Sequence, residues 1–129
     1  MIQIDTHVLA WSQLEPRKLS RAARSAINRA GLDGGLAVSA ATLVELAGLI
    51  ARGRIRSTGT MESTMRAFVA GIEVLPVTLE VAMLTAQFPP DFSSDPMDRI
   101  IAATARAEGL PLVTADRRIL DCPLLKTIW

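Results

Sequence analysis

Short apolar runs alternate along the chain with longer stretches in which apolar positions recur every three or four residues. The short runs predict strands at residues 2–4, 36–38, 72–77, 112–114 and 124–128. The longer stretches predict helices at residues 20–30, 40–52, 61–70, 78–87 and 95–108, with a further short helix around residues 7–11. Strand and helix therefore follow one another along the sequence.

Residues of helix-capping type mark several of these boundaries. Ser20, Ser39 and Thr78 precede predicted helices and carry side chains that accept hydrogen bonds from free backbone N–H groups. Asp95 and Pro96 open the last long helix as cap and first helical residue. Glycines are expected to end four of the helices, and these are Gly31, Gly53, Gly71 and Gly109.

The predicted strands are short and apolar on both faces, and helices flank them. This pattern is typical of a parallel sheet that is covered on both sides. We therefore expect an α/β fold, a three-layer α/β/α sandwich with a central parallel sheet of four to five strands, in a single domain over residues 1–129. Sheets of this kind bind ligands at the carboxyl ends of their strands, where the strand order switches.

Composition narrows the class of protein. Half of the residues are hydrophobic and 21% are charged, which supports a folded core. The longest apolar stretch, residues 43–51, contains Glu45 and is too short to span a bilayer, and no signal peptide is evident, so we expect a cytoplasmic location. The single Cys122 cannot form an internal disulfide and is expected to be a packing residue.

The formal net charge of +1 gives no overall reason to expect a polyanionic partner. The distribution of the basic residues is more informative, because they gather in two short runs. One run holds Arg52, Arg54 and Arg56, and the other holds Arg17, Lys18, Arg21 and Arg24. Contact with phosphates and a solvated helix face explain such runs equally well.

Four acids lie at positions that a parallel sheet would bring to its carboxyl edge. Asp5 directly follows the first predicted strand, and Asp116 follows the fourth. Glu45 lies in a helix that is apolar almost all round and is expected to be largely buried, where an ionised carboxylate is costly unless it is paired, metal-bound or protonated. Asp98 lies in the first turn of its helix, on the apolar face.

Each acid also has a structural explanation. Asp5, Asp98 and Asp116 suit helix N-termini, Glu45 can reach solvent or pair with an arginine, and Asp95 is best explained as a cap that could add a water-mediated metal contact. Four converging carboxylates would raise one another's pKa, and a divalent cation removes that conflict. Oxygen-only donors favour Mg²⁺ or Mn²⁺ over zinc.

The segments that carry these acids resemble the PIN-domain ribonucleases, most closely the VapC-type toxins of toxin–antitoxin pairs. The resemblance spans nearly the whole chain, in order and with normal spacing, through residues 4–11, 38–47, 95–105 and 112–116. Two positions depart from the pattern of the family. Val44 stands where relatives often have an aromatic residue, and residues 90–94 lack the His or Arg that often precedes the Asp-Pro-x-Asp-Arg motif. These departures bear on the choice of RNA rather than on catalysis.

The resemblance implies an RNA hydrolase whose catalytic, metal-binding residues are Asp5, Glu45, Asp98 and Asp116. Its substrate would be a tRNA, an rRNA or an mRNA, cut to leave a 5′-phosphate and a 3′-hydroxyl. It also implies a homodimer and a cognate VapB-type antitoxin whose basic tail occupies the active-site groove. Thr6 and Thr114 match the small polar residues beside the first and last acids.

Within this hypothesis Asp5 is the central ligand, flanked by Asp98 and Asp116, and Glu45 holds a second ion or orients the attacking water. Arg99 is equally suited to holding a phosphate oxygen and to forming an ion pair with Asp95. His7 is expected to pack near Trp11 rather than to act as a general base.

Three other functions stay open at this point. A receiver-like regulatory module would need paired acids after the first strand, whereas this strand ends in Asp5 alone. A phosphatase with an aspartyl nucleophile would need an Asp-x-Asp signature, but Thr6 and His7 follow Asp5. A catalytically inactive PIN domain that acts as a scaffold is the third alternative.

Overall fold

Five short strands form one parallel sheet in the order β3-β2-β1-β4-β5, in a computed structural model that describes residues 1–129. The strands are β1 (Ile2–Ile4), β2 (Leu36–Ser39), β3 (Glu73–Leu75), β4 (Leu112–Val113) and β5 (Thr127–Ile128). Gln3 in the central strand pairs with Ala37 on one side and with Leu112 on the other. The chain thus builds the sheet outward from β1, first in one direction and then in the other. The expected α/β fold with a parallel sheet is confirmed.

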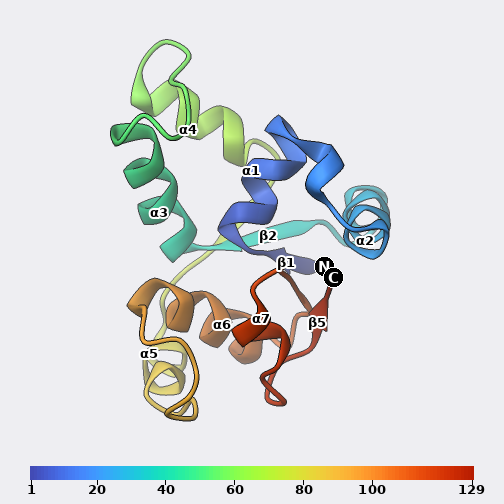
Figure 1. Cartoon of the computed structure of the whole chain (residues 1–129), viewed down its shortest axis with the longest axis vertical. Helices are drawn as coiled ribbons and strands as arrows, with labels where there is room; N and C mark the ends of the chain where they lie inside the picture. The colour runs from blue at the N-terminus through green and yellow to red at the C-terminus, as the bar shows by residue number, and fades with distance from the viewer.

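Seven α-helices and a short 3₁₀ turn connect the strands. They are α1 (Thr6–Leu14), η1 (Pro16–Lys18), α2 (Arg21–Leu32), α3 (Ala40–Ala51), α4 (Met61–Val69), α5 (Leu79–Thr85), α6 (Pro96–Glu108) and α7 (Arg117–Leu120). Figure 1 shows α1, α3 and α4 on one side of the sheet and α5, α6 and α7 on the other. The arrangement has three layers, as the sequence predicts. None of the helices has the length and apolar character needed to cross a membrane.

Two hydrophobic clusters hold these layers together, one on each face of the sheet. The first joins the sheet to α1–α4 and includes Ile4 and Leu46, and the second joins it to α5–α7 and includes Ile101 and Leu112. All four side chains are at most 1% exposed. Burial of a side chain of this size stabilises the fold by about 1.5–3 kcal/mol. The two cores therefore fix the helices against the sheet and leave its carboxyl edge as the place where polar side chains can meet.

Gln3, a buried polar residue in the middle of β1, ties the central strand to α6. Its Nε2 donates a hydrogen bond of 2.9 Å to the backbone oxygen of Ile101, and the side chain is 0% exposed. A buried amide that lost this partner would be costly. The bond therefore fixes the helix that carries Asp98 relative to the strand that leads into Asp5.

Several predicted boundaries differ from the observed ones. Gly31 does not end its helix, because α2 continues to Leu32. The chain turns instead at Gly34 and Gly35, whose φ angles of 92° and 86° favour glycine, whereas an interior glycine costs a helix only about 1 kcal/mol. Gly109 ends α6 with a φ of 66°, as predicted.

Three elements are shorter than their apolar runs suggested. The strand β3 ends at Leu75 rather than at Val77, because Pro76 has no N–H to donate to the sheet. The helix α5 ends at Thr85 rather than at Gln87, and only Thr127–Ile128 of the last run pair as a strand.

Candidate active site

The carboxyl ends of the central strands open onto a pocket of about 410 Å³. Asp5 follows β1, Asp116 follows β4, Glu45 lies on the helix after β2, and Asp98 lies in the first turn of α6. All four acids line this one pocket. Side chains that are up to 111 residues apart in the sequence therefore meet at the edge where the order of the strands switches.

Asp5 is held on both of its carboxylate oxygens. It caps α1, because Oδ1 accepts a hydrogen bond of 2.8 Å from the backbone N–H of Thr6. Oδ2 accepts a hydrogen bond of 2.8 Å from the hydroxyl of Thr114, and the residue is only 4% exposed. Each oxygen keeps a further lone pair. Asp5 therefore caps α1 and also presents a fixed carboxylate to the pocket, so its structural role and its proposed functional role are compatible.

Thr114 connects Asp5 with Asp116. Its Oγ1 donates to Asp5 and accepts a hydrogen bond of 3.0 Å from the backbone N–H of Asp116. Asp116 in turn caps α7 by accepting a hydrogen bond of 3.0 Å from the backbone N–H of Arg118. One buried hydroxyl thus sets the relative positions of two acids that follow neighbouring strands.

Glu45 extends from α3 toward the same pocket. The helix is less buried than the sequence suggested: Val44 is 62% exposed, and only one face of the helix packs against the sheet. The expectation was wrong because an all-apolar segment does not reveal which of its faces meets solvent. Glu45 lies at the margin of the packed face, where its Oε1 accepts a hydrogen bond of 2.6 Å from the Thr6 hydroxyl. That hydroxyl also lies 3.0 Å from the hydroxyl of Thr42.

Burial raises the pKa of the Glu45 carboxyl above its ordinary value. The hydrogen bond from Thr6 acts in the opposite direction, and the negative charges of Asp5, Asp98 and Asp95 raise the pKa further. The carboxylates are thus close enough for each to feel the others' charge. In the absence of a cation, their convergence has an electrostatic cost.

Asp98 experiences the same combination of effects. Its Oδ2 accepts a hydrogen bond of 2.7 Å from Ser93, whose side chain is buried. Burial raises the pKa of Asp98, the Ser93 hydroxyl opposes that rise, and the charges of Asp95, Asp5 and Asp116 add to it. No sequence pattern marks Ser93 as a site residue. Its only signal was a hydroxyl two positions before the capping Asp95.

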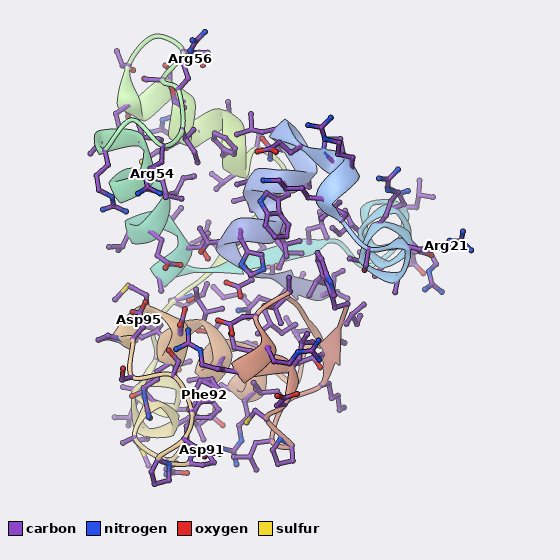
Figure 2. The ribbon with its side chains drawn as sticks, in the orientation of Figure 1. Arg21, Arg54, Arg56, Asp91, Phe92 and Asp95 are labelled. Carbon is purple, nitrogen blue, oxygen red and sulfur yellow. The ribbon has the colours of Figure 1, made fainter.

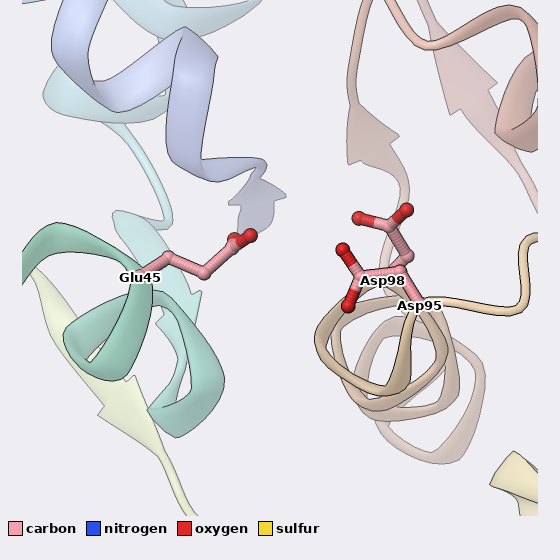
Figure 3. Close-up of side chains that lie close together, drawn as sticks. All are labelled: Glu45, Asp95 and Asp98. Carbon is pink, nitrogen blue, oxygen red and sulfur yellow. The ribbon is translucent and has the colours of Figure 1, made fainter. Parts of the chain in front are cut away.

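Three carboxylates come especially close together, as Figure 3 shows: Glu45 reaches from α3 toward Asp95 and Asp98 at the start of α6. One oxygen atom from each lies within 4.8 Å of the others. Asp95 is also the predicted cap of α6, accepting a hydrogen bond of 2.9 Å from the backbone N–H of Met97. An all-oxygen donor set of this kind suits a hard divalent cation. This grouping contains Asp95, which is exposed and does not line the pocket, whereas Asp5 and Asp116 line the pocket but are not part of the grouping.

Arg118 provides a positive charge among these acids that the sequence analysis missed. Its Nη2 lies 3.5 Å from Oδ2 of Asp98 and 3.5 Å from Oδ2 of Asp116. The one available signal was its place two residues after Asp116, which puts it in the first turn of α7. The pairing with Asp98 depends on how α6 and α7 are packed, and no sequence pattern reports that.

Arg99 does not form the ion pair with Asp95 that was one of its two suggested roles. Its Nε donates a hydrogen bond of 2.7 Å to the backbone oxygen of Ser93, and Nη1 donates one of 3.0 Å to the backbone oxygen of Thr85. The guanidinium also lies 5.8 Å from the centre of the Phe92 ring. Arg99 therefore ties the loop that carries Ser93 to Thr85, the last residue of α5.

His7 packs against Trp11 as expected, with ring centres 4.9 Å apart. Its Nε2 accepts a hydrogen bond of 2.9 Å from the backbone N–H of Ala115, and Nδ1 lies 3.7 Å from Oδ2 of Asp5. The lone pair of Nε2 is therefore already engaged. This arrangement makes His7 a brace between α1 and the segment after β4.

Comparison with known proteins gives a consistent picture. Residues 2–123 match the family model of the PIN domain. The chain is 36% identical over 130 residues to ribonuclease VapC22 of Mycobacterium tuberculosis, which covers 99% of this chain and 98% of that protein. The solved structure of VapBC2 from Rickettsia felis bound to a DNA fragment from their promoter gives a TM-score of 0.76 at 16% identity, covering 98% of this chain and 97% of that one.

A toxin–antitoxin complex from Klebsiella pneumoniae gives a TM-score of 0.67 at 18% identity and covers 97% of this chain and 95% of that one. At these identities the two structural likenesses establish the fold. The family model and the 36% identity, each spanning most of the chain, establish the family. This chain belongs to the PIN-domain family.

Proposed function

We propose that this protein is a metal-dependent endoribonuclease and the toxin of a VapBC-type toxin–antitoxin pair. The observation that carries the proposal is the convergence of Asp5, Glu45, Asp98 and Asp116 on one pocket of a PIN domain. Its similarity to a ribonuclease, VapC22, along nearly its whole length supports the same activity. We take residues 1–129 as one PIN domain, because helices from both ends of the chain cover the same sheet.

The donor set of the pocket supports Mg²⁺ or Mn²⁺ as the cofactor, held by oxygens of Glu45, Asp95 and Asp98 with Asp5 and Asp116 close by. When bound, such an ion lowers the pKa of water and offsets charge on the reacting phosphate. Asp5 contributes a carboxylate that the Thr6 N–H and the Thr114 hydroxyl hold in one orientation. The pocket is therefore preorganised before the substrate arrives.

Glu45 is proposed to orient the attacking water. Its Oε1 accepts the hydrogen bond from Thr6, which leaves Oε2 to take the proton of that water. Attack in line with the leaving oxygen then produces a 5′-phosphate and a 3′-hydroxyl. Thr6 acts as a positioning residue, since its hydroxyl holds the Glu45 carboxylate.

The proposed partners follow from the relatives. Structural neighbours include VapBC proteins and a toxin–antitoxin complex, so we propose a VapB-type antitoxin as the partner of this chain. We also propose a homodimer, as the family resemblance implies, and a cytoplasmic location. The substrate is RNA, whether tRNA, rRNA or mRNA. A receiver-like module or an inactive scaffold would not cleave RNA in a metal-dependent way. A cleavage assay therefore distinguishes both alternatives from a ribonuclease.

The test compares cleavage of total cellular RNA and of labelled oligonucleotides in Mn²⁺ and in EDTA. Asp5→Asn is the informative variant, because asparagine retains the ability to cap α1 and removes the charge. We expect cleavage in Mn²⁺ alone and a loss of at least about 100-fold in the variant. Asp91→Asn is the matched control, since Asp91 is exposed and lies apart from Asp95 in Figure 2. Cleavage in EDTA, or an Asp5→Asn protein as active as the wild type, would contradict the proposal.

A further inference from the structure

Arg52 borders the acidic pocket without pairing with any of its acids. It is the C-cap residue of α3 and one of the residues that line the pocket. None of the ion pairs of the protein includes it. Arg118 is paired with two acids, and Arg99 donates to backbone oxygens. The Arg52 guanidinium is therefore a cation at the pocket that is still available to a ligand.

The local sequence of α3 makes room for this guanidinium. Residues 45, 48, 49 and 52 follow helical spacing, so Glu45, Gly48, Leu49 and Arg52 share the face that lines the pocket. A Cβ atom at Gly48 would lie 3.1 Å from Nη1 of Arg52 and 3.5 Å from Nη2. A glycine inside a helix costs about 1 kcal/mol relative to alanine. The helix thus keeps a destabilising residue at the position over which the guanidinium lies.

We propose that Arg52 binds a backbone phosphate of the substrate beside the scissile bond, an inference that rests on the proposed ribonuclease function. RNA is a polyanion, whereas the pocket is lined by four acids, so the substrate needs an unpaired cation at the rim. A guanidinium can hold two oxygens of one phosphate at once. Its place about two turns along α3 from Glu45, roughly 10 Å along the helix axis, sets the bound phosphate on the same side of the pocket as the proposed position of the attacking water.

The same geometry separates Arg52 from the other arginines of its run. Arg54 and Arg56 are exposed and do not line the pocket. Figure 2 shows Arg54 beside the upper part of α3 and Arg56 at the top of the view, both away from Asp95. Arg54 and Arg56 are therefore interpreted as solvent-exposed arginines, whereas Arg52 is interpreted as a phosphate-binding arginine. The sequence favoured neither phosphate contact nor solvent exposure for this run of arginines, and we assign the first to Arg52 and the second to the other two.

The test measures binding of a fluorescent single-stranded RNA oligonucleotide in Mn²⁺ at several salt concentrations, with every protein carrying Asp5→Asn to prevent cleavage. We expect Arg52→Gln to weaken binding about tenfold at low salt and to reduce the slope of log K against log salt by about 0.7, the value for one phosphate of a single strand. Arg54→Gln is the matched control and is expected to change the affinity less than about twofold.

Gly48→Val supplies a second arm, because a Cβ at this position lies 3.1 Å from Nη1 of Arg52 and obliges the guanidinium to shift while Arg52 remains in the chain. We expect it to weaken RNA binding as Arg52→Gln does. In the active background, Arg52→Gln should raise KM more than it lowers kcat, an effect that a purely structural residue would not produce.

Unchanged RNA affinity in Arg52→Gln, or an equal loss in Arg54→Gln, would overturn the inference. Absence of any RNA binding by the Asp5→Asn protein would overturn it as well. Failure of the proposed function is seen separately, as metal-independent cleavage or as full activity of Asp5→Asn in the cleavage assay. If cleavage depends on the metal and on Asp5 while Arg52→Gln binds RNA normally, only the assignment of Arg52 fails.

Discussion

The guanidinium of Arg118 lies 3.5 Å from the carboxylate of Asp98, although the two residues belong to different helices, α7 and α6. The same nitrogen lies 3.5 Å from Asp116. A single cation therefore bridges two of the pocket's acids and partly offsets their mutual repulsion. A divalent ion that used these oxygens would meet a competing positive charge.

Replacement of Arg118 by glutamine is accordingly expected to strengthen binding of Mn²⁺. Because the Arg118 side chain is 56% exposed, we expect a modest gain of about twofold to fivefold. Isothermal titration calorimetry would measure the affinity. Arg117→Gln is the matched control, since Arg117 is the exposed neighbour on the same helix and forms no ion pair. Weaker Mn²⁺ binding by the Arg118 variant would mean that the arginine organises the acids rather than competing for them.

Thr114→Val is predicted to damage the site through loss of a hydroxyl alone. The change keeps the shape of the side chain but removes the donor to Asp5 and the acceptor for the N–H of Asp116. Loss of a buried partner costs about 1–3 kcal/mol, so a fall in melting temperature and in cleavage rate is expected. Thr104→Val is the matched control, because Thr104 is also buried and its hydroxyl donates to the backbone oxygen of Ile100. This variant should lower stability without a comparable loss of cleavage rate, measured at temperatures where both proteins are folded. Equal rates in the two variants would contradict this role.

The raised pKa values of Glu45 and Asp98 predict how the stability of the metal-free protein changes with pH. In the folded state both carboxyls keep their protons to a higher pH than in the unfolded state, where their pKa values are near 4.5 and 3.8. The folded state therefore binds more protons in this window, and stability falls as pH rises through it. Above the raised pKa values both carboxyls are ionised in the folded protein, and the electrostatic penalty on stability is fully present. Below the ordinary pKa values both carboxyls are protonated, and the penalty is absent.

Thermal melting in EDTA over a pH series tests that prediction, with the double variant Glu45→Gln/Asp98→Asn as the reference. The difference in melting temperature between the reference and the wild type should grow as pH rises above about 4.5 and should shrink when Mn²⁺ is added. A difference that stays constant with pH would show that the two acids do not carry this electrostatic cost.

The parts of the fold that depend on local pattern could be predicted from the sequence. The cap at Asp95 and the left-handed Gly109 define α6 at both ends, and both were identified by residue type. The convergence of Asp5 and Asp116 was also predictable, because parallel strands bring their carboxyl ends to one edge. These features need only the order of the elements and the direction of each strand.

Features that depend on how elements pack could not be predicted. The periodicity of α3 does not show which face meets solvent, so the exposure of Val44 was missed. The pairing of Arg118 with Asp98 requires two helices to meet at a particular angle. The bonds from Arg99 to loop carbonyls depend on the path of a loop that no pattern specifies.

We propose that carboxylates from separate parts of the chain form one site for a divalent ion. Titration of Mn²⁺ into the RNA-free protein, followed by calorimetry, tests it most directly, with Asp98→Asn as the test variant and Asp91→Asn as the matched control. We predict saturable binding by the wild type and the control, and an affinity at least about tenfold weaker in Asp98→Asn. Equal affinities in all three proteins, or no binding by the wild type, would contradict the account.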